Sequence, residues 1–421
     1  MTAAAEPTGL LAAVDRLLEP ADAAAAGFPG DSGARQPLHT VYVPADRYRR
    51  DLPARYGAAA LRLLDEHAPD AAAFAAVLGL PGATGDVLGR VRAKLAAQPV
   101  EDLRVDFEDG YGLRPDDEED AAALAAGRAL AAGVGDAGAP LLCGVRVRSL
   151  EPATRRRSLR TLDLVVRGAV EAGGLPPRFV AVLPKVVHPA EATALVAVCE
   201  ALEAAHGLAA GALRFELQVE VPRAVVGPDG AATVARLVHA SAGRCEGLHY
   251  GTYDFSAAAG VPASEQALDH PLADHAKAVV QLAAAGTGVR VSDGSTNVVP
   301  AGDAAQVHAA WRLHARLVDR ALRRGLYQGW DLHPGQLPTR FAASYAFLRA
   351  ELATTGDRLR AYVSRAATDV LDEPATAQAL AATVLRGLES GAVDDAEALA
   401  ATGLDRAALG RLARRERLGE P

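Results

Sequence analysis

Ionisable residues stand at the ends of five short apolar runs in this 421-residue chain. The run ends are Asp106 to Gly112, Val145 to Arg148, Leu183 to Val186, Gln218 to Pro222 and Tyr250 to Asp254. Acids and bases are mixed there, and charges that converge in a protein interior are costly unless they are paired or bound to a metal. The pattern therefore indicates an active site.

The residue types at these ends suggest metal-assisted chemistry. Glu220 and Asp254 end neighbouring runs and could share one Mg²⁺ or Mn²⁺ ion while leaving positions open for water and substrate. A 2-oxo acid could chelate that ion, which would stabilise the enolate formed when the adjacent carbon–carbon bond breaks. Arg146 offers a planar fork for a substrate carboxylate or an enolate oxygen. Glu108 and Asp109 could accept hydrogen bonds from metal-bound water or orient Arg146.

The same residues have structural interpretations. Glu220 and Asp254 could form an ion-pair network with the bases at the run ends, although clusters of perturbed acids favour functional sites. Lys185 could contact the substrate or could neutralise these acids, and the sequence leaves both roles open. His333 and His249 are predicted to be hydrogen-bonded core histidines.

The elements that would position these residues alternate regularly. Strand-like runs are separated by alanine- and leucine-rich helical patterns such as 121–132, 190–205 and 304–323. Eight strands separated by helices are typical of an α/β fold, the (β/α)₈ TIM barrel, whose catalytic groups lie at the carboxyl ends of the strands. The predicted strands are 38–43, 103–107, 141–147, 179–183, 215–219, 247–250, 289–292 and 326–331.

The chain divides into three predicted segments. Residues 1–36, rich in alanine and then in glycine, are predicted to form an N-terminal helix and loop extension. Residues 37–340 form the barrel, and residues 341–421 contain only helical patterns, which are predicted to form a C-terminal helical cap. Apolar residues such as Phe341 and Tyr345 give this last segment a face to bury.

The composition excludes several classes of function. The chain has 44 basic and 52 acidic residues and a net charge of −8, which gives no reason to expect nucleic acid as a partner. The widely spaced Cys143, Cys199 and Cys245 match no disulfide or zinc pattern and favour a reduced, intracellular protein. Neither a signal-peptide pattern nor an apolar stretch long enough to span a bilayer is present, so a cytoplasmic protein without membrane contact is predicted.

Three other motifs are assigned structural roles. The G-x-G-x-x-G string at 133–138 follows a helix and precedes a strand, the opposite of the order in a dinucleotide-binding motif. The acidic run 116–120 is predicted to open a helix, where negative charge is favourable. The basic cluster of 155–157 and Arg160 is predicted to be a solvated face, with phosphate or coenzyme A recognition as the alternative.

The run-end motifs VDFEDGYG, GVRVRSL, VLPKV, LQVEVPRAV and GLHYGTYDFSAAAG resemble, in order, those of the citrate lyase β-subunit and malyl-CoA lyase superfamily, which includes the class II 2-oxo acid aldolases. The string GWDLHPGQ at 329–336 resembles the strand-eight signature of that superfamily. The match covers roughly residues 38–345 and keeps the motif order. Arg148 and Tyr253 depart from the superfamily pattern and indicate an outlying member.

This resemblance implies that Glu220 and Asp254 are the metal ligands and that Arg146 binds the substrate. Arg148, Gly251 and Thr252 are further substrate-binding candidates. The implied activity is that of a Mg²⁺-dependent carbon–carbon lyase acting on a 2-oxo acid such as pyruvate, oxaloacetate or glyoxylate, or on an acyl-CoA. A homo-oligomer, trimer or hexamer, is also implied. A malate-synthase-like condensing or thioester-hydrolysing enzyme and a catalytically silent barrel subunit are the alternatives.

Overall fold

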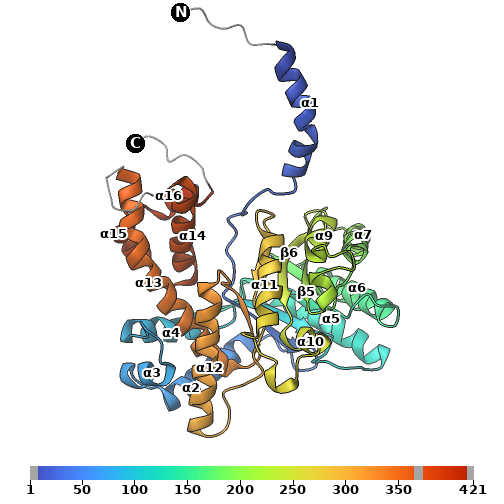
Figure 1. Ribbon diagram of the computed structural model, residues 1–421. Coiled ribbons are helices and arrows are strands. Elements are labelled where there is room, and N and C mark those ends of the chain that lie inside the picture. Colours follow the sequence, from blue (N-terminus) through green and yellow to red (C-terminus); the bar gives the residue numbers. More distant parts are fainter. Residues whose placement is uncertain (1–7, 365–372, 415–421) are drawn as a thin grey trace, which may run out of the picture.

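Eight parallel strands form the centre of the molecule. The computed structural model describes residues 8–364 and 373–414. Within these ranges the strands lie in one sheet in the order β7-β6-β5-β4-β3-β2-β1-β8. A bridge between Ser292 and Gln328 brings β7 back to β8, so the sheet nearly closes into a barrel surrounded by helices (Figure 1). The predicted (β/α)₈ fold is confirmed.

The elements follow the predicted alternation closely. The largest difference at a strand end is three residues, at the start of β8, where 326 was predicted and 329 is observed. The strands are β1 (His39–Pro44), β2 (Asp102–Asp106), β3 (Leu142–Arg146), β4 (Phe179–Leu183), β5 (Arg214–Val219), β6 (Cys245–Tyr250), β7 (Arg290–Ser292) and β8 (Gly329–Asp331). The helices are α1 (Thr8–Ala25), α2 (Leu52–His67), α3 (Ala71–Leu78), α4 (Gly85–Ala97), α5 (Asp116–Ala132), α6 (Arg155–Glu171), α7 (Pro189–His206), α8 (Pro222–Val225), α9 (Thr233–Ala240), α10 (Thr252–Ala258), α11 (Pro271–Ala284), α12 (Ala304–Arg323), α13 (Leu337–Ser364), α14 (Pro374–Ser390), α15 (Asp395–Thr402) and α16 (Arg406–Ala413), with short 3₁₀ turns η1 (Ala263–Glu265) and η2 (Pro334–Gln336).

The interior of the barrel carries polar side chains in addition to aliphatic ones. Alternate residues of a strand face the same side, and in β2 these are Asp102, Arg104 and Asp106, all buried. Nη2 of Arg104 lies 3.1 Å from Oδ2 of Asp102 and 2.8 Å from Oε2 of Glu216 on β5. A TIM barrel is usually filled by branched aliphatic side chains. Here a buried ion-pair network takes their place on one side of the interior.

The N-terminal helix stands clear of the barrel in Figure 1. Its apolar residues Leu10, Leu11 and Leu17 are exposed, at 61%, 59% and 79% of their surface. Among the described helices, none is both long enough and apolar enough to cross a bilayer.

The described C-terminal helices lie at one end of the barrel. Helices α14 and α16 line a cavity together with residues 31–36 and with residues 284–291, which precede and begin β7. They therefore lie near the amino ends of the strands, opposite to the end where the predicted site residues are. Helices α14 and α16 therefore do not cover the carboxyl-terminal mouth of their own barrel, and capping of a mouth by this segment stays a prediction.

Two glycines let α5 and α6 cross in close contact. A Cβ atom on Gly127 of α5 would lie 2.1 Å from the carbonyl oxygen of Val165, and one on Gly168 of α6 would lie 2.4 Å from that of Leu124. Neither position can accept a larger side chain unless the helices separate. This crossing holds α5 and α6 against the barrel next to β2 and β3.

We expect Gly127→Ala to lower the free energy of unfolding by about 1–3 kcal/mol, because the added methyl group forces the two helices apart. Gly89→Ala in α4 is the matched control, since Gly89 is an exposed mid-helix glycine with no atom within 4 Å of an added Cβ. That variant should raise the free energy of unfolding by about 0.5–1 kcal/mol. Urea unfolding measures both, and equal effects would contradict the close crossing.

Candidate active site

Arg146 occupies the carboxyl end of β3 as a fixed, buried cation. Its Nε and Nη2 each donate to Asp106, at 2.7 Å from Oδ1 and from Oδ2. Its guanidinium carbon lies 4.9 Å from the ring centre of Tyr42 and 5.4 Å from that of Trp330. Burial opposes the charge, but the carboxylate of Asp106 outweighs burial and raises the pKa of Arg146. Nη1 is the nitrogen that Asp106 leaves available.

Asp106 is the functional residue that sequence reasoning missed. Glu108 and Asp109 are predicted to accept hydrogen bonds from metal-bound water or to orient Arg146; the bidentate contact with Arg146 comes from Asp106, and the contact with metal-bound water stays a prediction. Glu108 makes only a 3.3 Å contact with Nη1 of Arg146, and Asp109 contacts Lys185 instead. One feature of the sequence could have indicated Asp106: it is two residues after Arg104 and four after Asp102, so all three face the same side of β2. In the sheet, Asp106 lies opposite Arg146.

The ammonium group of Lys185 contacts three of the acids of the site. Nζ contacts Glu108, lies 3.0 Å from Oδ2 of Asp109 and 3.4 Å from Oδ2 of Asp254. Burial alone would lower the pKa of Lys185, but the hydrogen bond to Glu108 and the charge of Glu220 outweigh burial and raise it. These contacts provide the neutralising role that the sequence left open. A contact with substrate stays a prediction.

Glu220 lies at the end of β5, with only 2% of its surface exposed. Its Oε1 accepts a hydrogen bond of 2.8 Å from the backbone N–H of Lys185. Burial raises the pKa of Glu220 to about 7; Lys185 and Arg146 oppose this shift, whereas Asp254 adds to it. The next strand must come very close, since a Cβ on Gly251 would lie 2.4 Å from Cβ of Glu220. Gly251 is therefore required for the placement of Glu220.

The remaining predicted residues lie around this cluster. Asp254 stands in the first turn of α10, where the helix dipole favours a carboxylate, and 46% of its side chain is exposed. Thr252 donates its hydroxyl to the carbonyl of Ser295 at 3.0 Å. Arg148 contacts the carbonyl of Gly112 at 2.7 Å and pairs with Glu119 at 2.9 Å. Substrate binding by Thr252 and Arg148 stays a prediction, and in this structure both make contacts within the chain.

The carboxylates are suitable donors for a small divalent cation. No group of three or more His, Cys, Asp and Glu residues in the described ranges could hold a metal ion by itself. Mg²⁺, however, is commonly bound by one or two carboxylates and completes its shell with water and substrate. Arg146 is paired with Asp106, Lys185 contacts the three carboxylates of Glu108, Asp109 and Asp254, and burial raises the pKa of Glu220. Negative charge is therefore in excess among these residues, so Glu220 and Asp254 fit a hard cation.

The glycine-rich string, the acidic run, the basic cluster and the two histidines make contacts within the protein. The string at 133–138 forms turns between α5 and β3, and the acidic run 116–120 opens α5. Arg157 and Arg160 pair with Asp120, so they join α6 to α5. His333 accepts a hydrogen bond from the backbone N–H of Gly335 at 3.1 Å, and burial lowers its pKa. His249 is buried and lies 3.0 Å from Glu216, as expected for a core histidine.

Comparisons with known proteins agree with this fold. A family model described as a domain of unknown function, DUF6986, matches residues 17–417. No curated protein matches the chain. A citrate lyase structure from Burkholderia xenovorans LB400 is 21% identical with a TM-score of 0.56, and the match covers 87% of this chain and 96% of that one. The CitE protein of Mycobacterium tuberculosis, solved with magnesium, acetoacetate and coenzyme A, is 19% identical with a TM-score of 0.50, covering 85% of this chain and 99% of that one. The predicted resemblance is confirmed at the level of the fold.

Proposed function

We propose that this chain, which belongs to the DUF6986 family, is a Mg²⁺-dependent lyase that breaks or forms a carbon–carbon bond next to a 2-oxo acid. One observation carries the proposal: a fixed guanidinium and two carboxylates suited to a divalent cation, Glu220 and Asp254, lie at the carboxyl ends of β3, β5 and β6. That is the end at which TIM-barrel enzymes carry out their chemistry.

Each residue of the site has a proposed task. When bound, the cation supplies the Lewis acidity that stabilises an enolate. Glu220 and Asp254 hold the cation, and Arg146 binds the substrate carboxylate or the enolate oxygen through Nη1, while Asp106 fixes its orientation. The ammonium of Lys185, held by Glu108 and Asp109, balances the negative charge of the site.

The class of substrate is proposed on the same basis. The Mycobacterium tuberculosis CitE protein was solved with acetoacetate, a 3-oxo acid, together with magnesium and coenzyme A. Its shared fold supports a small oxo acid or an acyl-CoA as the substrate of this chain, and we propose a 2-oxo acid such as pyruvate, oxaloacetate or glyoxylate because it can chelate the cation through its carboxylate and keto oxygens. We also propose a cytoplasmic location, and a homo-oligomeric assembly in which the C-terminal segment covers the mouth of a neighbouring barrel.

The activity is tested on the full chain with a panel of 4-hydroxy-2-oxo acids and, separately, with hydroxyacyl-CoA thioesters. We expect cleavage of at least one class, with release of pyruvate or glyoxylate followed by NMR. Treatment with EDTA should abolish the cleavage, and added MgCl₂ or MnCl₂ should restore it, because the enolate loses its Lewis acid without the cation. Cleavage that continues in excess chelator, or no cleavage of any substrate with Mg²⁺ present, would contradict the proposed function.

A further inference from the structure

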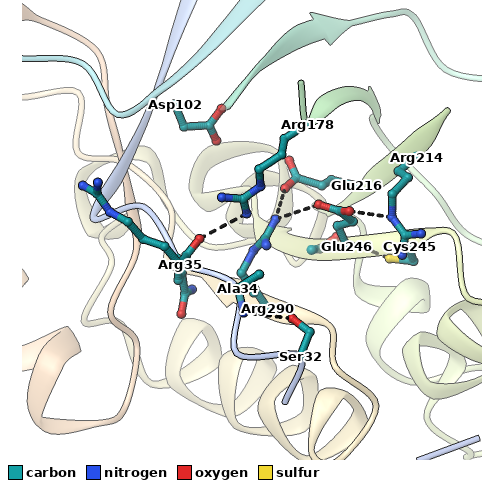
Figure 2. Close-up of polar contacts among 12 residues, drawn as sticks. Ser32, Ala34, Arg35, Asp102, Arg178, Arg214, Glu216, Cys245, Glu246 and Arg290 are labelled. Carbon is teal, nitrogen blue, oxygen red and sulfur yellow. Dashed lines mark hydrogen bonds and ion pairs between the residues drawn. The ribbon is translucent and has the colours of Figure 1, made fainter. Parts of the chain in front are cut away.

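A second collection of charged residues lies at the amino ends of the strands, at the opposite end of the barrel from the candidate active site. A pocket of about 650 Å³ is lined there by Arg178, which directly precedes β4, by Arg214 at the start of β5, and by Arg290 at the start of β7. Figure 2 shows these arginines with the nearby Glu216 and Glu246. This amino-terminal pocket places several positive charges in one hollow.

The segment between α1 and β1 forms one wall of the amino-terminal pocket. The backbone N–H of Gly30 donates to the carbonyl of Gly286 at 2.8 Å. The ring of Phe28 packs edge-on against His239, with 5.3 Å between the ring centres. Ser32 belongs to the lining. The wall of the pocket is therefore held in place by contacts of the segment with α9 and with the loop before β7.

The acids of this region are already matched by other arginines. Glu246 lies 2.5 Å from Nε of Arg214 and 3.1 Å from Nη2 of Arg290. Glu216 lies deeper and pairs with Arg104 at 2.8 Å, which leaves Arg290 a longer contact of 3.6 Å. Asp102 also pairs with Arg104, at 3.1 Å. The three carboxylates of Asp102, Glu216 and Glu246 therefore match the charges of Arg104, Arg214 and Arg290.

Arg178 adds a positive charge that these carboxylates do not match. Within the described ranges it pairs with no carboxylate, and its Nη2 donates to the backbone carbonyl of Arg35 at 3.1 Å, as drawn in Figure 2. Burial and the neighbouring charge of Arg290 lower the pKa of Arg178. Its φ of 58° is in the left-handed region, which costs energy for a residue with a side chain. The charge of Arg178 is thus half-buried, strained and without a carboxylate contact of its own, which is unfavourable unless an anion binds it.

We propose that the amino-terminal pocket binds a small anion, with its phosphate or carboxylate oxygens at the guanidinium group of Arg178 and within reach of Arg290. The planar forks of arginine match the oxygens of phosphate and carboxylate. A negative charge there neutralises the unmatched charge of Arg178. The pocket volume lies within the range typical of small-molecule sites.

Calorimetric titration of the full chain with inorganic phosphate, and separately with succinate, tests this site. Titration with KCl at the same ionic strength is the control. We expect saturable binding of at least one of the two, and the one that binds decides between a phosphate and a dicarboxylate ligand. Arg178→Gln should weaken that binding at least about tenfold, because charge-assisted hydrogen bonds are lost. Arg178→Lys keeps the charge without the fork, so its affinity should lie between those of the wild type and Arg178→Gln.

Thermal unfolding gives an independent measurement. Without the anion, Arg178→Gln should not lower the Tm, because it removes repulsion from Arg290 and breaks no ion pair. With the anion, the gain in Tm that the wild type shows should be absent from this variant. Arg62→Gln, which removes one charge from an exposed position on α2, is the matched control and should keep the wild-type gain.

Three results would overturn the proposal. The first is a wild type that binds neither phosphate nor succinate saturably, and the second is binding that survives Arg178→Gln. The third is a loss of Tm in Arg178→Gln without any anion, which would give Arg178 a structural role instead. None of these results would contradict the proposed lyase activity, because the residues proposed for that activity lie at the other end of the barrel and are tested by separate assays.

Discussion

Glu220→Gln is expected to lower kcat/KM by about three orders of magnitude, equivalent to about 4 kcal/mol of transition-state stabilisation. The substitution keeps the shape of the side chain but removes the negative charge that would hold the cation. Asp254→Asn should act in the same direction. Calorimetric titration with MgCl₂ should show that both variants bind the ion more weakly, and steady-state kinetics should show the loss of turnover.

The stability of Glu220→Gln separates this role from a purely structural one. Burial raises the pKa of Glu220, so the charged carboxylate is unfavourable in the folded protein without a cation. A neutral amide should therefore leave the metal-free Tm unchanged or higher. Glu265→Gln, at an exposed acid in η1, is the control and should keep metal binding and turnover. A Glu220→Gln protein with wild-type Mg²⁺-dependent turnover would refute the assignment of the ligand.

Arg146→Lys is expected to have the second large effect. It keeps a positive charge but loses the fork that binds both oxygens of Asp106. The kcat/KM should fall about 10- to 150-fold, corresponding to the roughly 1.5–3 kcal/mol of a charge-assisted hydrogen bond. Breaking the buried pair should also lower the free energy of unfolding, by up to about 3–5 kcal/mol. Steady-state kinetics and urea unfolding measure the two effects separately.

Comparison with Arg148→Lys decides which arginine binds the substrate. Both arginines are buried at the end of β3, and both pair with an acid, so both variants should lose stability. If Arg146 is the substrate arginine, kcat/KM falls further in Arg146→Lys than in Arg148→Lys, at a temperature where both proteins are folded. The reverse order would show that Arg146 is structural and Arg148 the substrate contact.

The strands and most helices could be predicted because their signals are local. The bounds of Phe179–Leu183 and Ala304–Arg323 coincide with those predicted, since each is a continuous apolar or amphipathic pattern between clear breaks. The positions of the charged residues at the strand ends follow from the same reasoning. Parallel strands of a barrel bring their carboxyl ends together whatever the details of packing.

The contacts within the site could not be predicted in the same way. The pairing of Asp106 with Arg146 depends on the register between two strands that are 40 positions apart in sequence. The central place of Lys185 depends on a φ of 56° directly after β4, a conformation that its sequence does not signal. Likewise, the position of the C-terminal helices near the amino ends of the strands results from packing against distant loops, which no local pattern encodes.

The contact between β7 and β8 is the least extensively paired one between neighbouring strands of the described barrel. These two strands have three residues each, and the bridge between Ser292 and Gln328 joins them. A fluctuation that opens a few hydrogen bonds costs least there. The residues proposed to bind the cation and substrate stand at the ends of β3 and β5 and at the start of α10, away from this contact. We therefore expect local opening of the barrel to begin between β7 and β8 and to leave the geometry of the proposed site intact.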